Sequence, residues 1–170
     1  MGKQDLHLIL ISGAGRNVGK TTLGCAIIES LYSKEEVTAV KISKHLHPLT
    51  EKQKVIIQKP GLVITEELDR ESSKDSSRFL RSGATHSFFV MTDDDHFPEL
   101  AVWIKQNLTG SVICETGYLG NYIIPDIAFY IENEYNEKQI SWNFPYFNIR
   151  FNGEVFTPSI EDTIIKNLGQ

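Results

Sequence analysis

The chain has 170 residues, of which 41% are hydrophobic and 23% are charged, with a formal net charge of −5 and a pI near 5.5. This length suits a single domain that buries roughly two thirds of its unfolded surface without metals or disulfides. The acidic balance argues against a nucleic-acid partner, because nucleic-acid binders carry a basic excess or stripe. The N-terminus holds only a short apolar run, so we expect a cytoplasmic protein without a membrane partner.

The first predicted elements are a strand, a glycine-rich turn and a helix. Residues 6–11 are mostly apolar, which is typical of a buried parallel strand. Residues 22–32 repeat leucine and isoleucine at helical spacing and so predict a helix with one apolar face. The order of strand, turn and helix is the context that a phosphate-binding loop requires.

The turn itself matches the phosphate-binding pattern G-x-x-x-x-G-K-[ST], except that Ala14 fills the first position, between Gly13 and Gly15. Glycines allow a sharp bend whose N–H groups point inward and surround an anion. Lys20 is then placed to reach the β- and γ-phosphates, and the Thr21 hydroxyl to coordinate Mg²⁺. The predicted nucleotide-binding residues are Gly15, Arg16, Asn17, Val18, Gly19, Lys20, Thr21 and Thr22.

A second strand is predicted at residues 37–42, joined to the first by a right-handed crossover through the helix. Residues 43–74 follow as a polar segment without clear periodicity, interrupted by Pro48, Pro60 and Gly61. A segment of this length without regular structure is usually functional, so we expect a long mobile loop there.

The rest of the chain alternates between helices and strands. We expect helices at 75–82 and 97–108, strands at 84–92, 111–115 and 127–131, an aromatic strand or hairpin between Trp142 and Phe151, and a helix from Ser159. The pattern predicts an α/β protein, residues 1–170 forming one phosphate-binding-loop (P-loop) domain. We expect the three-layer α/β/α P-loop NTPase fold with a mainly parallel central sheet.

An acidic residue at a strand end is the second expected part of the site. Residues 111–115 end in Glu115, and a glycine turn follows at Gly117. Ligands of parallel sheets bind outside the carboxyl ends of the strands, so we expect Glu115 and the loop to open onto the same crevice. Asp93 competes for this role, although the run from Asp93 to Asp95 also suits a solvated turn that caps the next helix.

Four segments together resemble the molybdopterin-guanine dinucleotide biosynthesis protein B family of small P-loop proteins. They are the loop 14–22, the segment 44–47, the run 74–84 and the turn 115–117. Members of the family usually carry a Lys-His-x-His-His cluster, and this chain differs from it at Pro48, where the family has a histidine. The resemblance implies GTP as the nucleotide, molybdopterin or a molybdenum-cofactor biosynthetic enzyme as a partner, and a homodimer.

The same resemblance gives four candidate substrate contacts, Lys44, His45, Asp75 and Arg78. Two plainer interpretations of these residues stay open. Asp75 can cap the helix that it begins while the arginines remain solvated. His45 and His47 alternate along an extended segment, but they lack a third metal ligand at useful spacing.

The loop also resembles that of dethiobiotin synthetase, and Lys41 then corresponds to that family's strand-end lysine. This similarity implies an ATP-dependent ligase or kinase that acts on a small acid. A third interpretation is an adaptor that uses the nucleotide as a switch, without productive catalysis.

The sequence thus predicts binding of a nucleoside triphosphate, GTP or ATP, with Mg²⁺, followed by slow hydrolysis. Catalysis of phosphoryl transfer is mostly electrostatic, which gives Lys20 a charge-neutralising role. Thr21 and Glu115 would organise the metal. Arg16 either contacts the γ-phosphate or stays in solvent.

Overall fold

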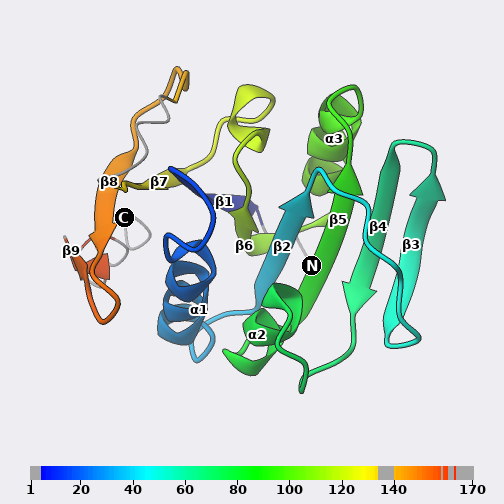
Figure 1. Ribbon diagram of the computed structural model, residues 1–170, viewed down its shortest axis with the longest axis horizontal. Coiled ribbons are helices and arrows are strands. Elements are labelled where there is room, and N and C mark those ends of the chain that lie inside the picture. The colour runs from blue at the N-terminus through cyan, green and yellow to red at the C-terminus, as the bar shows by residue number, and fades with distance from the viewer. Residues whose placement is uncertain (1–4, 134–139, 158, 161–162, 164–170) are drawn as a thin grey trace.

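The computed structural model describes residues 5–133, 140–157, 159–160 and 163 (Figure 1). These residues form one sheet of nine strands, with three α-helices and one 3₁₀ helix. The strands are β1 (Leu6–Gly13), β2 (Val37–Ser43), β3 (Gln53–Lys59), β4 (Leu62–Glu67), β5 (His86–Thr92), β6 (Gly110–Glu115), β7 (Ile127–Ile131), β8 (Phe147–Phe151) and β9 (Phe156–Thr157). The helices are α1 (Lys20–Leu31), α2 (Asp75–Arg81), α3 (Phe97–Asn107) and the 3₁₀ turn η1 (Leu119–Asn121).

The sheet is mixed, with a parallel centre. Its strand order is β3-β4-β5-β2-β6-β1-β7-β8-β9. The six strands from β5 to β8 run parallel, whereas β4 and β3 at one edge and β9 at the other are antiparallel to their neighbours. The expected α/β class with a mainly parallel sheet is therefore confirmed.

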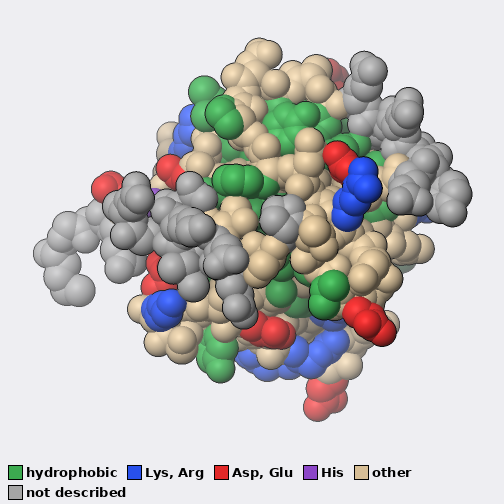
Figure 2. Space-filling view, turned by 90° about the vertical axis from the view of Figure 1, so that its left-hand side faces the viewer, with side chains coloured by type: hydrophobic (Ala, Val, Ile, Leu, Met, Phe, Trp, Pro, Cys, Tyr) green, Lys and Arg blue, Asp and Glu red, His purple; other side chains and the backbone are tan. Residues whose placement is uncertain are grey.

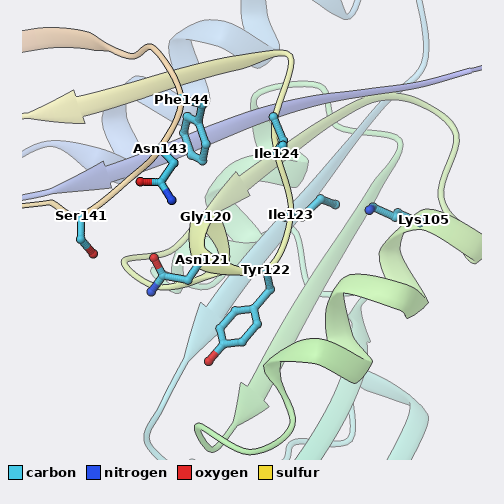
Figure 3. Close-up of a pocket in the computed structure, with 9 residues that line it drawn as sticks. All are labelled: Lys105, Gly120, Asn121, Tyr122, Ile123, Ile124, Ser141, Asn143 and Phe144. Carbon is cyan, nitrogen blue, oxygen red and sulfur yellow. The ribbon is translucent and has the colours of Figure 1, made fainter.

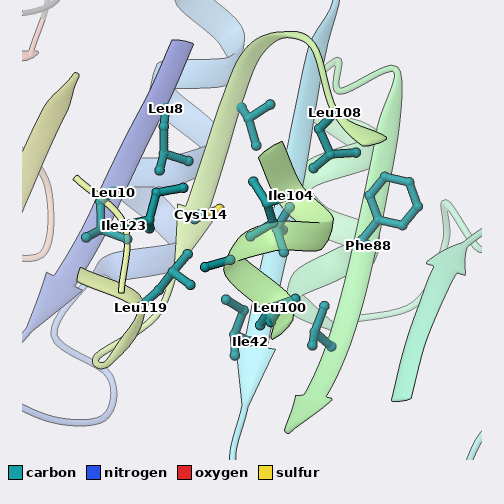
Figure 4. Close-up of a cluster of buried hydrophobic side chains, with 14 of the residues drawn as sticks. Leu8, Leu10, Ile42, Phe88, Leu100, Ile104, Leu108, Cys114, Leu119 and Ile123 are labelled. Carbon is teal, nitrogen blue, oxygen red and sulfur yellow. The ribbon is translucent and has the colours of Figure 1, made fainter. Parts of the chain in front are cut away.

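Helices cover both faces of the sheet, and strand alternation separates two cores. Ile9 and Ile11 of β1 pack in a cluster with residues of α1 and α2. Leu8 and Leu10, their neighbours in the chain, pack in a second cluster that includes Leu100 of α3 (Figure 4). The period of two along each strand thus places α1 and α2 on one face and α3 on the other.

The predicted elements are found near their expected bounds. The aromatic segment from Trp142 to Phe151 contains one strand, β8, which forms a hairpin with β9 beyond that segment. Most of the helix expected from Ser159 lies outside the described residues. Both cysteines are free, Cys114 fully buried and Cys25 partly so, and burial raises the pKa of both thiols. No helix in the described ranges combines the length and apolar character needed to cross a membrane.

The expectation of one long irregular loop at residues 43–74 is wrong in its middle part. β3 and β4 form an antiparallel hairpin there, and β4 adds both strands to the edge of the sheet. The sequence hides β3 because the register shifts between Val55 and Ile57, which breaks the alternation of polar and apolar residues. Pro60 and Gly61, interpreted as loop breakers, form the tight turn, with Gly61 at a φ of 79°.

Candidate functional site

The bend between β1 and α1 has a shape that depends on its glycines. A Cβ on Gly13 would lie 2.8 Å from Val18 and 3.0 Å from the carbonyl of Ile131, so a larger residue does not fit. Val18 is buried and anchors the bend on the core shared with α1. Gly19 has a φ of 102°, in the left-handed region that favours glycine. The Lys20 ammonium folds back over the bend and donates to the carbonyl oxygen of Gly15.

Glu115 and Thr21 meet at the carboxyl end of the central strands. β6 lies next to β1, so its last residue is held beside the start of α1. The Thr21 hydroxyl donates to the Glu115 carboxylate over 2.8 Å, and Glu115 is only 2% exposed. Two oxygen donors from separate elements are thus fixed next to the bend, as the sequence predicted for this pair.

Lys41 connects this carboxylate to a second one. It stands opposite Glu115 in the parallel register of β2 and β6, and its ammonium contacts the Glu115 carboxylate. The same ammonium lies 2.8 Å from the carboxylate of Asp75. Burial lowers the pKa of Lys41, but the two carboxylates outweigh burial, and the pKa is raised above its ordinary value. Lys41 is therefore a firmly charged bridge between β6 and α2.

Asp75 and Arg78 enter the site from α2. Asp75 is the first residue of the helix, and its N-cap is Lys74, so Asp75 is used for the ion pair and not for capping. Burial opposes the ionisation of Asp75, but Lys41 outweighs it and lowers the pKa of this carboxyl. Arg78 lies 3.8 Å from Asp75 and donates over 3.4 Å to the hydroxyl of Thr22 in α1. The two helix starts are thus linked through charged side chains.

These side chains surround a cleft of about 440 Å³. The cleft is lined by Arg16, Asn17, Gly19, Lys20, Thr21, Thr22, Lys41, Asp75, Arg78, Glu115 and Phe151. Most of the residues predicted from the sequence therefore converge on one site. Phe151 of β8 was not predicted, because nothing in an aromatic strand end signals that the chain returns to the loop.

The remaining candidate contacts lie outside this lining. The Lys44 ammonium pairs with Asp94 and lies 3.6 Å from the centre of the Tyr118 ring, a cation–π contact. His45 is exposed, and its Nε2 lies 3.5 Å from the guanidinium of Arg16. The structure therefore places His45 beside the bend but Lys44 at the neighbouring loops after β5 and β6.

Asp93, the competitor of Glu115, is engaged elsewhere. Its carboxylate lies 2.6 Å from Nδ1 of His96 and accepts the backbone N–H of His96 at the start of α3. The hydrogen bond with His96 is the main cause that lowers the pKa of Asp93. Asp93 thus stabilises the turn before α3 and does not line the cleft.

A second pocket of about 620 Å³ lies on the α3 side of the molecule (Figure 3). Lys105 of α3, the segment around η1 and the residues near Phe144 line it. The carboxamides of Asn121 and Asn143 belong to its lining, and none of the described residues that line it is acidic. Within the described part of the chain, this pocket and the cleft at the bend have no lining residue in common.

The aromatic region near the C-terminus divides between core and surface. Phe151 and Phe156 pack against the cluster under α1, whereas Tyr146 and Phe147 are 38% and 37% exposed. Figure 2 views the molecule from the β8–β9 edge, where hydrophobic side chains lie among polar and charged ones. Part of the aromatic stretch thus completes the core, and part reaches the surface.

No protein-family model, no curated protein and no solved structure matches this chain. The described residues also contain no group of three or more histidine, cysteine, aspartate or glutamate side chains that could hold a metal ion by themselves.

Proposed function

We propose that this chain is a P-loop protein that binds a nucleoside triphosphate with Mg²⁺ in the cleft at the bend and hydrolyses it slowly. The observation that carries this proposal is the meeting of Lys20, Thr21 and Glu115 at the carboxyl ends of the parallel strands. Ligands of such sheets bind at this edge, and the start of a helix after a glycine bend favours anions. The P-loop NTPase fold is part of the same proposal.

The donor atoms of the cleft suit Mg²⁺. This ion prefers oxygen ligands and takes one or two from the protein while phosphate oxygens and water supply the rest. The hydroxyl of Thr21 and the carboxylate of Glu115, 2.8 Å apart, offer such a pair. The negative charge of Glu115 is already neutralised by Lys41, so metal binding requires Lys41 to share or release this carboxylate.

The positive side chains of the cleft suit the phosphates. In the structure the Lys20 ammonium donates to the Gly15 carbonyl oxygen, which is a neutral acceptor. A phosphate oxygen in its place would be a charged acceptor and would form a stronger hydrogen bond. Arg78 lies beside Thr22 and is within the same lining. The expected catalysis is electrostatic, since phosphoryl transfer depends mainly on positioning and charge neutralisation.

The resemblance to the molybdopterin-guanine dinucleotide biosynthesis protein B family supports GTP as the nucleotide and a role in molybdenum-cofactor biosynthesis. It also supports a homodimer, for which the exposed Tyr146 and Phe147 offer aromatic surface. The mass of the protein in solution tests the dimer.

One observation favours a second candidate, an ATP-dependent ligase or kinase similar to dethiobiotin synthetase. Lys41 lies in the cleft beside the proposed metal position, where a cation at a strand end would contact an acid or a transferred phosphate. An enzyme of this class turns over faster when its small acceptor acid is added. A nucleotide-switched adaptor instead binds the nucleotide with negligible turnover.

Thermal unfolding with GTP, ATP and inorganic tripolyphosphate, each with and without Mg²⁺, tests the proposed function. A ligand that binds the folded state raises the unfolding temperature by mass action. We expect stabilisation of the wild-type protein that depends on Mg²⁺ and is absent in Lys20→Ala. The control is Lys105→Ala, which removes a lysine from the second pocket and should leave the stabilisation intact. Equal stabilisation of wild type and Lys20→Ala would reject the proposal.

A further inference from the structure

We propose that Phe151 is the contact for the nucleobase, and that its ring stacks on the base of the bound nucleotide. This inference rests on the proposed function and extends it from the phosphates to the nucleoside. It assigns a binding role to the C-terminal hairpin of β8 and β9, which lies far from the bend in the sequence but beside α1 in the fold (Figure 1).

The lining of the cleft separates two kinds of chemistry. Phe151 is the one apolar side chain among the described residues that line it, and the others are polar, charged or glycine. A nucleotide divides in the same way, because its phosphates and metal require charged partners whereas its base has two flat apolar faces. The charged lining at Lys20 and Glu115 suits the first part, and the ring suits the second.

The position of the ring is fixed by Gly19. A Cβ on Gly19 would lie 2.8 Å from Cδ1 and 3.0 Å from Cγ of Phe151, so the ring lies directly against the glycine backbone. Gly19 immediately precedes Lys20, and therefore the ring stands next to the place where the phosphates are expected. Phe151 and Lys20 line the same cleft, so a base attached to phosphates held by Lys20 has the ring close by.

The ring is also supported from behind. Phe156 stacks on Phe151 with centroids 4.5 Å apart and an interplanar angle of 25°. Both side chains pack against the core under α1, and β8 is paired with β7 in the sheet. A ring held in place before binding loses little freedom when a base stacks on it, which favours affinity.

Stacking distinguishes poorly between bases, because every base has a π-face. Phe151 should therefore contribute equally to GTP and ATP binding. Loss of a stacking ring costs on the order of 5- to 150-fold in affinity, from the range measured for base–aromatic stacking. Inorganic tripolyphosphate has no base, so its binding should not depend on the ring.

The test is a titration of wild type, Phe151→Leu and Phe151→Trp with Mg²⁺ and GTP, ATP or tripolyphosphate. Leucine keeps apolar volume but lacks a π-face, and we expect it to weaken GTP and ATP by the same factor, about tenfold, and tripolyphosphate by less than about twofold. Tryptophan keeps a π-face, so Phe151→Trp should retain affinity. Its added fluorescence should be quenched by GTP but not by tripolyphosphate, relative to the native Trp103 and Trp142.

Phe147→Leu is the matched control, since Phe147 stands on the same strand and contacts Phe129 instead of the cleft. It should bind all three ligands as wild type does. If wild type binds nucleotides but Phe151→Leu binds them equally well and Phe151→Trp shows no quenching, the inference on Phe151 is wrong while the proposed function stands. If wild type binds neither nucleotide nor tripolyphosphate, the proposed function itself fails.

Discussion

The two faces of the central sheet are built from alternate residues of the same strands, yet they end differently. On the α3 face, Ile42 and Cys114 continue the apolar core to the carboxyl ends of β2 and β6. On the other face, Lys41 and Glu115 stand one residue away and form an ion pair. A shift of one residue along a strand therefore separates packing from charge.

The starts of two helices place the charges on one face of the sheet. The helices α1 and α2 both begin at this edge, and they bring Thr21 and Asp75 to the two strand residues. Buried charges are tolerated only when they are paired, and this cluster pairs each carboxylate with Lys41. On the α3 face, the helix contributes apolar side chains to the core, such as Leu100 and Ile104.

The largest expected loss of stability comes from truncating a buried side chain, and each face of the sheet offers one to compare. Phe79 of α2 is fully buried and lies against Gly24 of α1, and Leu100 of α3 is equally buried. We expect Phe79→Ala to lower the free energy of unfolding by about 4 kcal/mol and Leu100→Ala by about 3 kcal/mol. Only Phe79→Ala should also weaken nucleotide binding, because α2 carries Asp75 and Arg78.

Urea unfolding and calorimetric titration at low temperature measure both quantities. Equal nucleotide affinity in the two variants would show that α2 packing does not position the cleft.

The next effect concerns the buried ion pair. Glu115→Gln keeps the volume but leaves Lys41 with Asp75 alone, and we expect a loss of about 3 kcal/mol, at the low end for a broken buried pair. Lys41→Met should be destabilising as well, because it leaves the buried Glu115 carboxylate without its ion-pair partner. The double variant should be more stable than the sum of the single losses predicts, and denaturant unfolding of all four proteins measures this. Losses that add within about 0.5 kcal/mol would contradict the coupling.

A smaller effect appears in the pH dependence of Asp75. Its pKa is lowered in the folded protein, so ionised Asp75 stabilises the fold above its unfolded pKa near 3.9, and this contribution is lost as the pH falls through the folded pKa. Asp75 is 36% exposed, so water screens the pair and we expect less than about 1 kcal/mol.

Urea unfolding of wild type and Asp75→Asn at several pH values checks this. Their difference in stability should stay constant between pH 7 and 5 and shrink below about pH 4. A difference that grows on acidification has the wrong sign for an ion-paired carboxylate.

The smallest effect should come from the far edge of the sheet. Lys59 of β3 pairs with Glu99 of α3 over 2.5 Å, but the side chains are 40% and 45% exposed. Lys59→Met should change stability by less than about 0.5 kcal/mol, because exposed pairs contribute little. A loss comparable to that of Glu115→Gln, measured by the same unfolding experiment, would remove the distinction between buried and exposed pairs.

The sequence predicts the elements whose pattern is local. The apolar run of β1 and the glycines before Lys20 identify the bend, and strand ends with polar residues identify Glu115. Parallel neighbours bring strand ends to one edge, so the meeting of Thr21 with Glu115 follows from the fold class.

Long-range pairing accounts for what the sequence does not predict. The sequence does not predict β3, because a bulge disrupts its alternation of polar and apolar residues and its exposed lysines are typical of a loop. The ion pair of Lys41 with Asp75 depends on where α2 packs, and the approach of Phe151 to Gly19 depends on β8 joining the sheet beside β7. None of these contacts has a local pattern at either residue.

A crystal structure of the protein with Mg²⁺ and a non-hydrolysable GTP analogue would show whether the bend holds the nucleotide. We predict the phosphates inside the bend from Gly15 to Thr22, with the Lys20 ammonium moved from the Gly15 carbonyl to a phosphate oxygen and the metal beside Thr21 and Glu115. A nucleotide bound elsewhere, with Lys20 still held by Gly15 and the bend empty, would contradict the account.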